Sequence, residues 1–426
     1  MTSHDSTIDR LFRRDPAILD DPYPVYRTLR ESGPVLRVDG PLDAPPWLNA
    51  WHVFDYAGTA ACLRDSRLSS RRQMAALPLE RFGIDPTTPA ARFFWTVQEQ
   101  TMLTMDAPDH TRLRRLALKA FTPRVVDGMR DDIETIVNGL LDDLASRKGE
   151  RFDVMAELAS PLPAMVIASL LGLPAADWPS FKRWSDGIIG FNITQQKLDS
   201  FHELGQYLLA RIRERRIQPT GDLISALISA RDEHDALTED ELVAQCVILL
   251  VGGHETTTFA LGNAVYRLLA DPPLWESLPH IPIETVVEEL LRYDSPFQSL
   301  SRRANVDFEL EDEVIAAGDT LWLWIAAANH DPAQFNAPER IDLTREENRH
   351  LSFGLGPHFC LGAALARLEL QIALATLRQR FPRLRLESET ADWKRDGAIR
   401  GPQSLLVTTA TTKPLPCCGL LFMDQH

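Results

Sequence analysis

Cys360 is the residue whose neighbours best suit a chemical role. It lies in the segment FGLGPHFCLG, residues 353–362, where two glycines and a proline favour a tight loop. Apolar residues at 361, 365, 368 and 372 predict a helix that opens at Cys360. Amide N–H groups and the dipole at a helix start favour a thiolate, which can ligate iron. Two other interpretations are a buried apolar side chain, or a nucleophile with His358 as its base.

A polar segment interrupts an otherwise apolar helical stretch. The sequence GGHETT, residues 252–257, places two glycines where each costs roughly 1 kcal/mol relative to alanine. Glu255 in such surroundings needs a partner. The simpler interpretation is a helix bend with a solvated glutamate. His254 is expected to point away, as a packed or solvated residue.

Basic residues gather on a predicted helix that opens near residue 108. His110 and Arg114 are four residues apart and therefore share one face of this helix. Arg112, Arg115 and Lys119 lie on the same stretch, and such a run is usually a solvated face.

A short predicted helix carries the sequence ELLR. Glu289 and Arg292 are three residues apart and can meet on one face, a pair worth about 0.2–0.5 kcal/mol in solvent. Glu288 is the exposed alternative acid in the same run. On its own the pair is weak evidence of any special role.

Together these segments resemble the cytochrome P450 family. Residues 353–362 meet every fixed position of the family's haem-binding signature, F-G-x-G-x-H-x-C-x-G, and residues 252–256 resemble its oxygen-binding groove, A/G-G-x-D/E-T. ELLR stands where the family has E-x-x-R. The resemblance spans about 15–409 and implies a mainly α fold with small β-sheets, shaped as a triangular prism. Haem b would lie between the long central helix and the loop of Cys360.

The resemblance also implies a role for each matching residue. Cys360 would be the metal ligand, Gly253 would give close approach to the haem, Thr256 would hydrogen-bond dioxygen or its water, and Glu255 would relay protons. Glu289 and Arg292 would form a buried structural pair that ties their helix to the segment before the cysteine. The residues expected to bind the cofactor are His110, Arg114, Arg302, His358, Phe353, Gly354 and Gly362. Arg303, beside Arg302, could take the same part.

The implied activity is that of a haem-thiolate monooxygenase. It would use dioxygen and electrons to hydroxylate or epoxidise a hydrophobic small molecule, in secondary metabolism or catabolism. No flavin or iron–sulfur motif is visible, so a ferredoxin-type partner with its reductase would deliver electrons, and the basic residues of the 108–120 helix could form its docking patch. The expected substrate pocket draws on Phe94, Leu249, Phe297 and Leu300. Alternatives are oxidative coupling, a peroxide-driven reaction, a haem protein without turnover, or a Cys–His hydrolase without haem.

The elements that must position these residues are mostly helical. Thr238 followed by Glu241 has the chemistry of a capping box, which predicts a long helix from about 238 to about 270. A shorter helix is expected from Pro282 to Ser295. Further helices are expected near 125–148, 153–171, 178–190 and 197–216, and strands near 34–38, 51–54, 306–310 and 314–324.

Composition limits the class of protein. The formal net charge of −15 argues against nucleic acid or an anionic membrane as partner. Five cysteines without a Cys-x-x-Cys pair favour a reducing cytosol, and a polar start to the chain predicts no signal peptide, so a cytoplasmic protein is expected. One domain over 1–426 is expected, with a flexible tail at 413–426 that carries Cys417 and Cys418.

Overall fold

The computed structural model describes residues 3–13, 15–40, 48–71, 79–145, 151–188, 193–232, 235–394 and 399–409. The tail expected at 413–426, with its two cysteines, lies outside the described residues.

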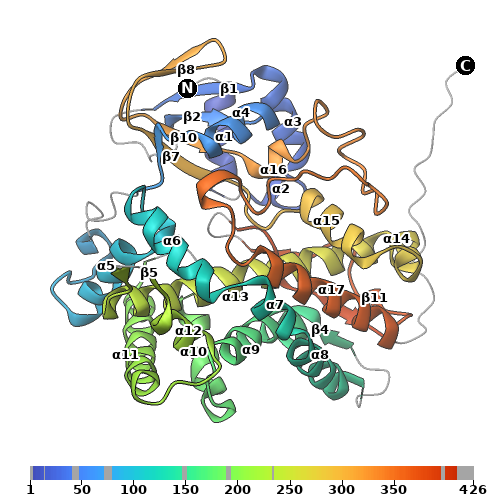
Figure 1. Ribbon diagram of the computed structural model, residues 1–426. Helices are drawn as coiled ribbons and strands as arrows, with labels where there is room; N and C mark the ends of the chain where they lie inside the picture. The colour runs from blue at the N-terminus through green and yellow to red at the C-terminus, as the bar shows by residue number, and fades with distance from the viewer. Residues whose placement is uncertain are drawn as a thin grey trace, which may run out of the picture.

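A long helix, α13 (Glu239–Ala270), crosses the middle of the molecule (Figure 1). It begins with the predicted capping box, in which Thr238 Oγ1 accepts from the Glu241 amide and the Glu241 carboxylate accepts from the Thr238 amide. By length and apolar composition it could span a membrane, but 67% of its most apolar window is buried inside the protein. It is therefore the central core helix.

Other helices pack around α13 and give the fold its mainly α character, as predicted. Helices α8 to α12 lie on one side of it, and α17 runs beside it toward the cysteine loop (Figure 1). The helices expected in these regions are present. They are α6 (Asp109–Ala120), α8 (Arg130–Ala145), α9 (Pro161–Leu170), α10 (Trp178–Ile188), α11 (Gln195–Ile217), α15 (Ile283–Tyr293) and α17 (Ala363–Arg380). Four further helices were not predicted: α5 (Pro89–Gln100), α7 (Pro123–Gly128), α12 (Leu223–Ser229) and α14 (Pro272–Ser277).

The largest sheet has five strands in the order β1-β2-β10-β7-β3. It joins β1 (Val35–Asp39) and β2 (Asn49–Val53), near the start of the chain, to β10 (Thr320–Leu323) and β7 (Leu300–Ala304), far along it, and ends at β3 (Leu68–Ser69). The strands expected at 34–38 and 51–54 are confirmed, and those expected at 306–310 and 314–324 appear as β8 (Phe308–Leu310), β9 (Glu313–Ile315) and β10.

Short helices cover this sheet and were not predicted. They are α1 (Ser3–Phe12), α2 (Pro16–Leu19), α3 (Tyr23–Ser32), α4 (Tyr56–Arg64) and α16 (Ile325–Ala328). Tyr23 and Tyr26 of α3 share one core cluster with residues at the ends of the sheet strands, in which Tyr26 and Phe54 pack against Trp324.

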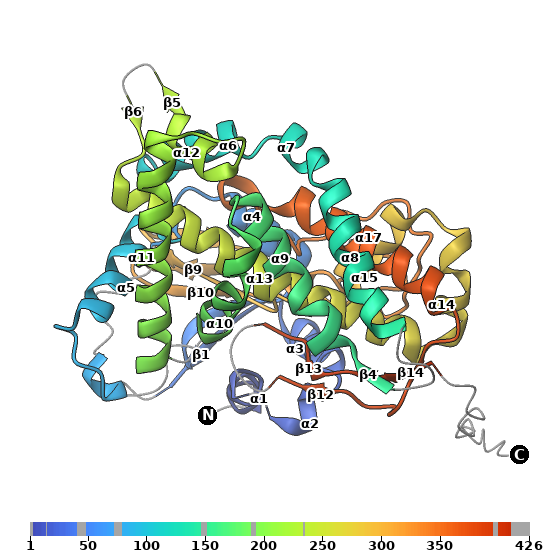
Figure 2. The same ribbon diagram turned by 90° about the horizontal axis from the view of Figure 1, so that it is seen from below.

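A buried charged cluster joins distant parts of the chain. Asp294, directly after α15, accepts hydrogen bonds from the Tyr23 hydroxyl at 2.7 Å, from Arg267 Nε at 2.8 Å and from Arg400 Nε at 3.1 Å. Arg400 also donates to the Asp20 carbonyl at 3.0 Å. It belongs to the loop of the hairpin formed by β12 (Asp392–Trp393) and β13 (Pro402–Ser404), which lies beside α1 and α2 (Figure 2).

Candidate active site

The cysteine loop is fixed by its backbone. The Cys360 amide donates to the Phe353 carbonyl at 2.8 Å, and Gly354 and Gly356 have φ of 69° and 73°. These left-handed conformations suit glycine. A Cβ on Gly356 would lie 2.6 Å from the Leu63 carbonyl oxygen at the end of α4, so the loop also needs glycine there to approach α4.

The Cys360 thiol is accessible to solvent, yet protein surrounds much of it. Desolvation raises the pKa of the thiol, while a hydrogen bond from the Gly362 amide and the charges of Arg114 and Arg367 act to lower it. Helix α17 begins at Ala363 rather than at Cys360, because Gly362 occupies the N-cap. The sequence prediction of the helix start is wrong by three residues. The backbone hydrogen bond to the sulfur, expected from the amides of a helix start, comes from the single amide of Gly362. A metal cation would deprotonate such a thiol.

Four basic side chains converge beside this loop. The rings of His110 and His358 lie 4.0 Å apart, and Arg114 Nη2 donates to the Phe359 carbonyl at 2.5 Å. Burial, followed by the influence of His110, Arg302 and Arg114, lowers the pKa of His358 to about 3.

These basic residues fit the two propionate groups of a haem. His110 Nε2 is buried and has no hydrogen-bond partner within the described chain, and burial lowers the pKa of Arg114. Buried cationic and imidazole donors of this kind are stabilised by carboxylates. On β7, Arg302 is half-buried whereas Arg303 is exposed, which favours Arg302 over its neighbour.

The glycines of α13 differ in what they contact. Thr256 Oγ1 donates to the Gly252 carbonyl at 2.6 Å, one turn earlier on the same face, and a Cβ on Gly252 would meet nothing within 4 Å. A Cβ on Gly253 would lie 2.9 Å from Cδ1 of Ile167 on α9. This corrects the sequence prediction that Gly253 gives close approach to the cofactor. Gly253 accommodates α9, and Gly252 is the small residue that shares a helix face with Thr256.

Glu255 has a buried cationic partner that sequence reasoning missed. Lys394 Nζ forms an ion pair with Glu255 Oε1. The two residues are 139 positions apart, so no local pattern could have connected them. His254 points to other elements, as expected. Its Nε2 contacts the Ser160 carbonyl at 3.0 Å, its Nδ1 contacts Ser185 Oγ of α10, and burial lowers its pKa to about 4.

The pair Glu289–Arg292 is fully buried, and its two hydrogen bonds are both 2.8 Å long. Arg292 also donates to the carbonyls of Asn329, Pro338 and Arg340, which belong to the segment before the cysteine loop. The pair therefore joins α15 to that segment.

Glu288 is not the exposed acid that the sequence suggested. It accepts from Arg367 Nε at 2.6 Å, and His350 Nε2 lies 3.2 Å from its carboxylate. Burial acts to raise its pKa, but these hydrogen bonds outweigh burial and lower the pKa to about 2. Arg367 in turn lies over the Phe353 ring, 4.3 Å from its centroid, so this second ion pair also supports the cysteine loop.

The residues expected in a substrate pocket separate into two groups. Leu249, Phe297 and Leu300 are half-buried, and Phe297 forms a β-bridge to Ile399 of the C-terminal hairpin. Phe94 is only 3% exposed and packs edge-to-face on Phe201 of α11. Phe94 therefore packs between α5 and α11, and its place in the pocket stays a prediction.

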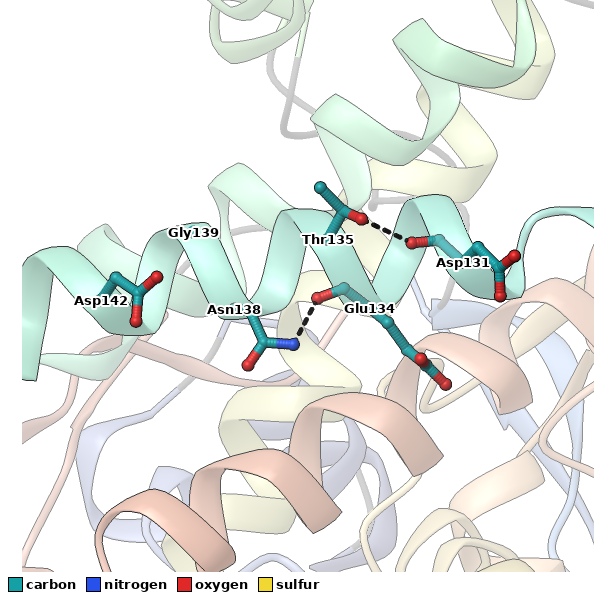
Figure 3. A pocket seen from close by; sticks show the side chains of 6 residues that line it. All are labelled: Asp131, Glu134, Thr135, Asn138, Gly139 and Asp142. Atoms are coloured by element: carbon teal, nitrogen blue, oxygen red, sulfur yellow. Dashed lines mark hydrogen bonds between the residues drawn. The ribbon is translucent and has the colours of Figure 1, made fainter.

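Two surface hollows lie on other elements. One, of about 570 Å³, follows successive turns of α8 (Figure 3). Its Thr135 and Asn138 side chains bond to carbonyls of the same helix. The other, of about 600 Å³, is bordered by α7, α8 and α12. Neither contains a residue predicted to act in chemistry.

Comparison with known proteins agrees with this geometry. A profile described as cytochrome P450 matches residues 192–280 and 270–409. The chain is 38% identical to the cytochrome P450 monooxygenase PikC of Streptomyces venezuelae, over 90% of this chain and 90% of that protein. It is 38% identical to a mycinamicin IV hydroxylase/epoxidase of Micromonospora griseorubida, over 90% and 94%.

Solved structures with similar folds belong to the same group. The bacillaene polyketide synthase cytochrome P450 PksS of Bacillus subtilis superimposes with a TM-score of 0.82 and 35% identity, covering 92% of this chain and 98% of that one. P450BioI, solved with a fatty acid ligated to acyl carrier protein, gives a TM-score of 0.81 and 36% identity, with 92% and 98% covered.

Proposed function

The chain belongs to the cytochrome P450 family and is a monooxygenase, and on this premise we propose how its residues serve the reaction. Cys360 would ligate the iron of haem b, and His110, Arg114, Arg302 and His358 would bind its propionates. The convergence of these four basic groups beside one loop cysteine is the observation that carries the proposal. The haem supplies the oxidising chemistry when bound.

The overall reaction is R–H + O₂ + 2 e⁻ + 2 H⁺ → R–OH + H₂O. The reaction therefore needs two protons delivered to the site. Glu255 is buried on α13, and Thr256 follows it with its hydroxyl on the open face of the same helix. We assign proton relay to Glu255 and hydrogen bonding to dioxygen or its water to Thr256. This pair favours a dioxygen-dependent reaction over a peroxide-driven one.

The substrate we propose is a hydrophobic small molecule of secondary metabolism. Leu249, Phe297 and Leu300 are apolar, half-buried, and come from α13, the segment after α15, and β7. Apolar side chains supplied by several elements are typical of a small-molecule pocket. Hydroxylation and epoxidation both fit such a site.

The electron donor we propose is a small acidic ferredoxin with its reductase, in the cytoplasm. Arg115 and Lys119 are exposed on α6, the helix that also carries His110 and Arg114. Arg112 does not belong to the proposed patch, because it pairs with Glu241 and Asp235. Leu118 of the same helix is also exposed, and an apolar contact beside charged groups suits a transient protein partner.

The first experiment is a carbon monoxide difference spectrum of the reduced protein. Wild type should give the band of thiolate-ligated haem, and Cys360→Ser should lose it. Cys62→Ala is the matched control, because Cys62 is a buried thiol on α4 whose pKa burial raises to about 12. A wild-type spectrum without the thiolate band, or an unchanged Cys360→Ser, would contradict the proposal. The substrate is then identified by titrating the ferric protein with a compound library and monitoring the change in iron spin state.

A further inference from the structure

Lys394 and Glu255 form an ion pair in the interior, between the C-terminal hairpin and α13. Their side chains are 8% and 7% exposed. A buried ion pair is costly to desolvate and gives little net stability unless its geometry is good. Because one member of this pair, Glu255, is the proposed proton relay, the pair needs an explanation other than stability alone.

The lysine is fixed to α13 by more than this ion pair. Its Nζ lies 5.1 Å from the centroid of the Phe259 ring, which is one turn after Glu255 on the same helix face. The Lys394 amide donates to the Gly401 carbonyl at 2.9 Å, and a Cβ on Gly401 would lie 2.2 Å from Cδ1 of Phe259. The hairpin thus packs directly on the helix turn that follows the acid.

The hairpin is also attached to the fold at Arg400, on the far side of its loop from Lys394. The Arg400 amide donates to the Pro296 carbonyl at 2.7 Å, and the Arg400 guanidinium lies 3.7 Å from the centroid of the Trp393 ring. Trp393 directly precedes Lys394 in the chain. The backbone that carries the ammonium group is therefore tied to the rest of the fold on both sides.

We propose that Lys394 is a positioning residue, whose ammonium group holds the carboxylate of Glu255 in its buried position beside Thr256. This rests on the relay role proposed for Glu255. A carboxylate held by a cation on one oxygen keeps its second oxygen in a fixed place, from which a proton can be passed on. Without the ammonium group, the carboxylate would turn toward other donors. Proton delivery would then be less efficient, and fewer reducing equivalents would end in product.

The test compares four variants in a system with a ferredoxin and its reductase, using the compound selected by the spin-state titration. Lys394→Met removes the charge, Lys394→Arg retains it, and Glu255→Gln removes the acid. Arg151→Met is the control, because it breaks an exposed ion pair with Glu387, 3.0 Å long and outside the site. The measurements are product formed per reduced nicotinamide consumed, the solvent isotope effect on turnover, and substrate affinity.

Lys394→Met should lower product per reducing equivalent by about tenfold and change the solvent isotope effect, with substrate affinity unchanged. Lys394→Arg should recover most of the loss, and Arg151→Met should match wild type. A purely structural lysine would not produce this pattern, because loss of packing would also change substrate affinity.

A second measurement does not depend on turnover. Denaturation midpoints of wild type, Lys394→Met, Glu255→Gln and the double variant form a thermodynamic cycle, in which the double variant should lose less than the two single losses combined. Additive losses would overturn the proposal. If Lys394→Met formed as much product per reduced nicotinamide as wild type while Glu255→Gln formed less, the proposal for Lys394 would be overturned and the proposed function would stand. If Glu255→Gln formed as much product per reduced nicotinamide as wild type, the relay role of Glu255 itself would be overturned.

Discussion

Two neighbouring arginines on β7 have different surroundings because side chains alternate across a strand. Arg302 is half-buried near His358, while Arg303 is exposed on the other face. Arg302→Gln should therefore weaken haem retention by roughly 10–100-fold, since a hydrogen bond to a charged group contributes about 1.5–3 kcal/mol. Arg303→Gln should have no effect. The measurement is the rate of haem transfer to an acceptor apoprotein, and equal rates for the two variants would contradict the assignment of Arg302.

A buried histidine gives the protein a pH-dependent stability. Burial lowers the pKa of His254 to about 4 in the folded state, against 6.5 when it is unperturbed. The unfolded chain therefore binds more protons between these values, and stability should fall by about 3 kcal/mol as pH falls from 6.5 to 4. His254→Leu should give a shallower loss over this window in urea unfolding curves measured at several pH values. A slope equal to that of wild type would show that His254 is not buried in its neutral form.

At the scale of elements, the pair Glu289–Arg292 joins α15 to the segment before the cysteine loop. Arg292→Met should destabilise the fold by about 3–5 kcal/mol, because it leaves a buried carboxylate without its bidentate partner. The carboxylate would still contact Arg345, which lies 3.0 Å away but is not fully buried. Thermal unfolding of the haem-free protein measures the loss. Arg27→Met, which breaks an exposed pair with Glu339, is the control and should change little.

The packing of α13 on α9 gives a second prediction at this scale. Gly253→Val should cost about 1–3 kcal/mol, because its side chain would be forced against Ile167. Gly252→Ala should not cost stability, since alanine is the better helix former and the space beside it is open. Denaturation midpoints of the two variants decide the point, and a greater loss for Gly252→Ala would reverse the assignment of the two glycines.

The sequence predicted what local patterns determine. The capping box of Thr238 defines the start of α13, and helical spacing joins Glu289 to Arg292. The partner of Glu255 could not be predicted, because Lys394 reaches it only through tertiary packing. The two glycines were confused because neighbouring helix residues point about 100° apart, and only the position of α9 shows which one faces it. Similarly, apolar composition could not show that Phe94 packs on Phe201 of α11.

At the scale of the whole molecule, charge governs the choice of electron donor. The net charge of −15 repels an acidic partner, so a productive encounter depends on the local basic surface of α6. Arg115→Glu with Lys119→Glu should slow reduction by an acidic ferredoxin at least tenfold at low salt, and added salt should narrow the difference from wild type. Stopped-flow reduction under carbon monoxide measures both effects. An unchanged rate would place the docking surface elsewhere.

The charged cluster around Asp294 has a consequence for synthesis on the ribosome. Its members come from positions 23, 267, 294 and 400, so the cluster cannot close until nearly the whole chain has been translated. Until then Asp294 can pair with Arg267 and Tyr23 but lacks Arg400, so the cluster stays incomplete and the C-terminal hairpin cannot close over it. Ribosome-bound chains that end before residue 400 should therefore remain sensitive to protease. Native folding would be a late event, completed as the C-terminal hairpin emerges from the exit tunnel.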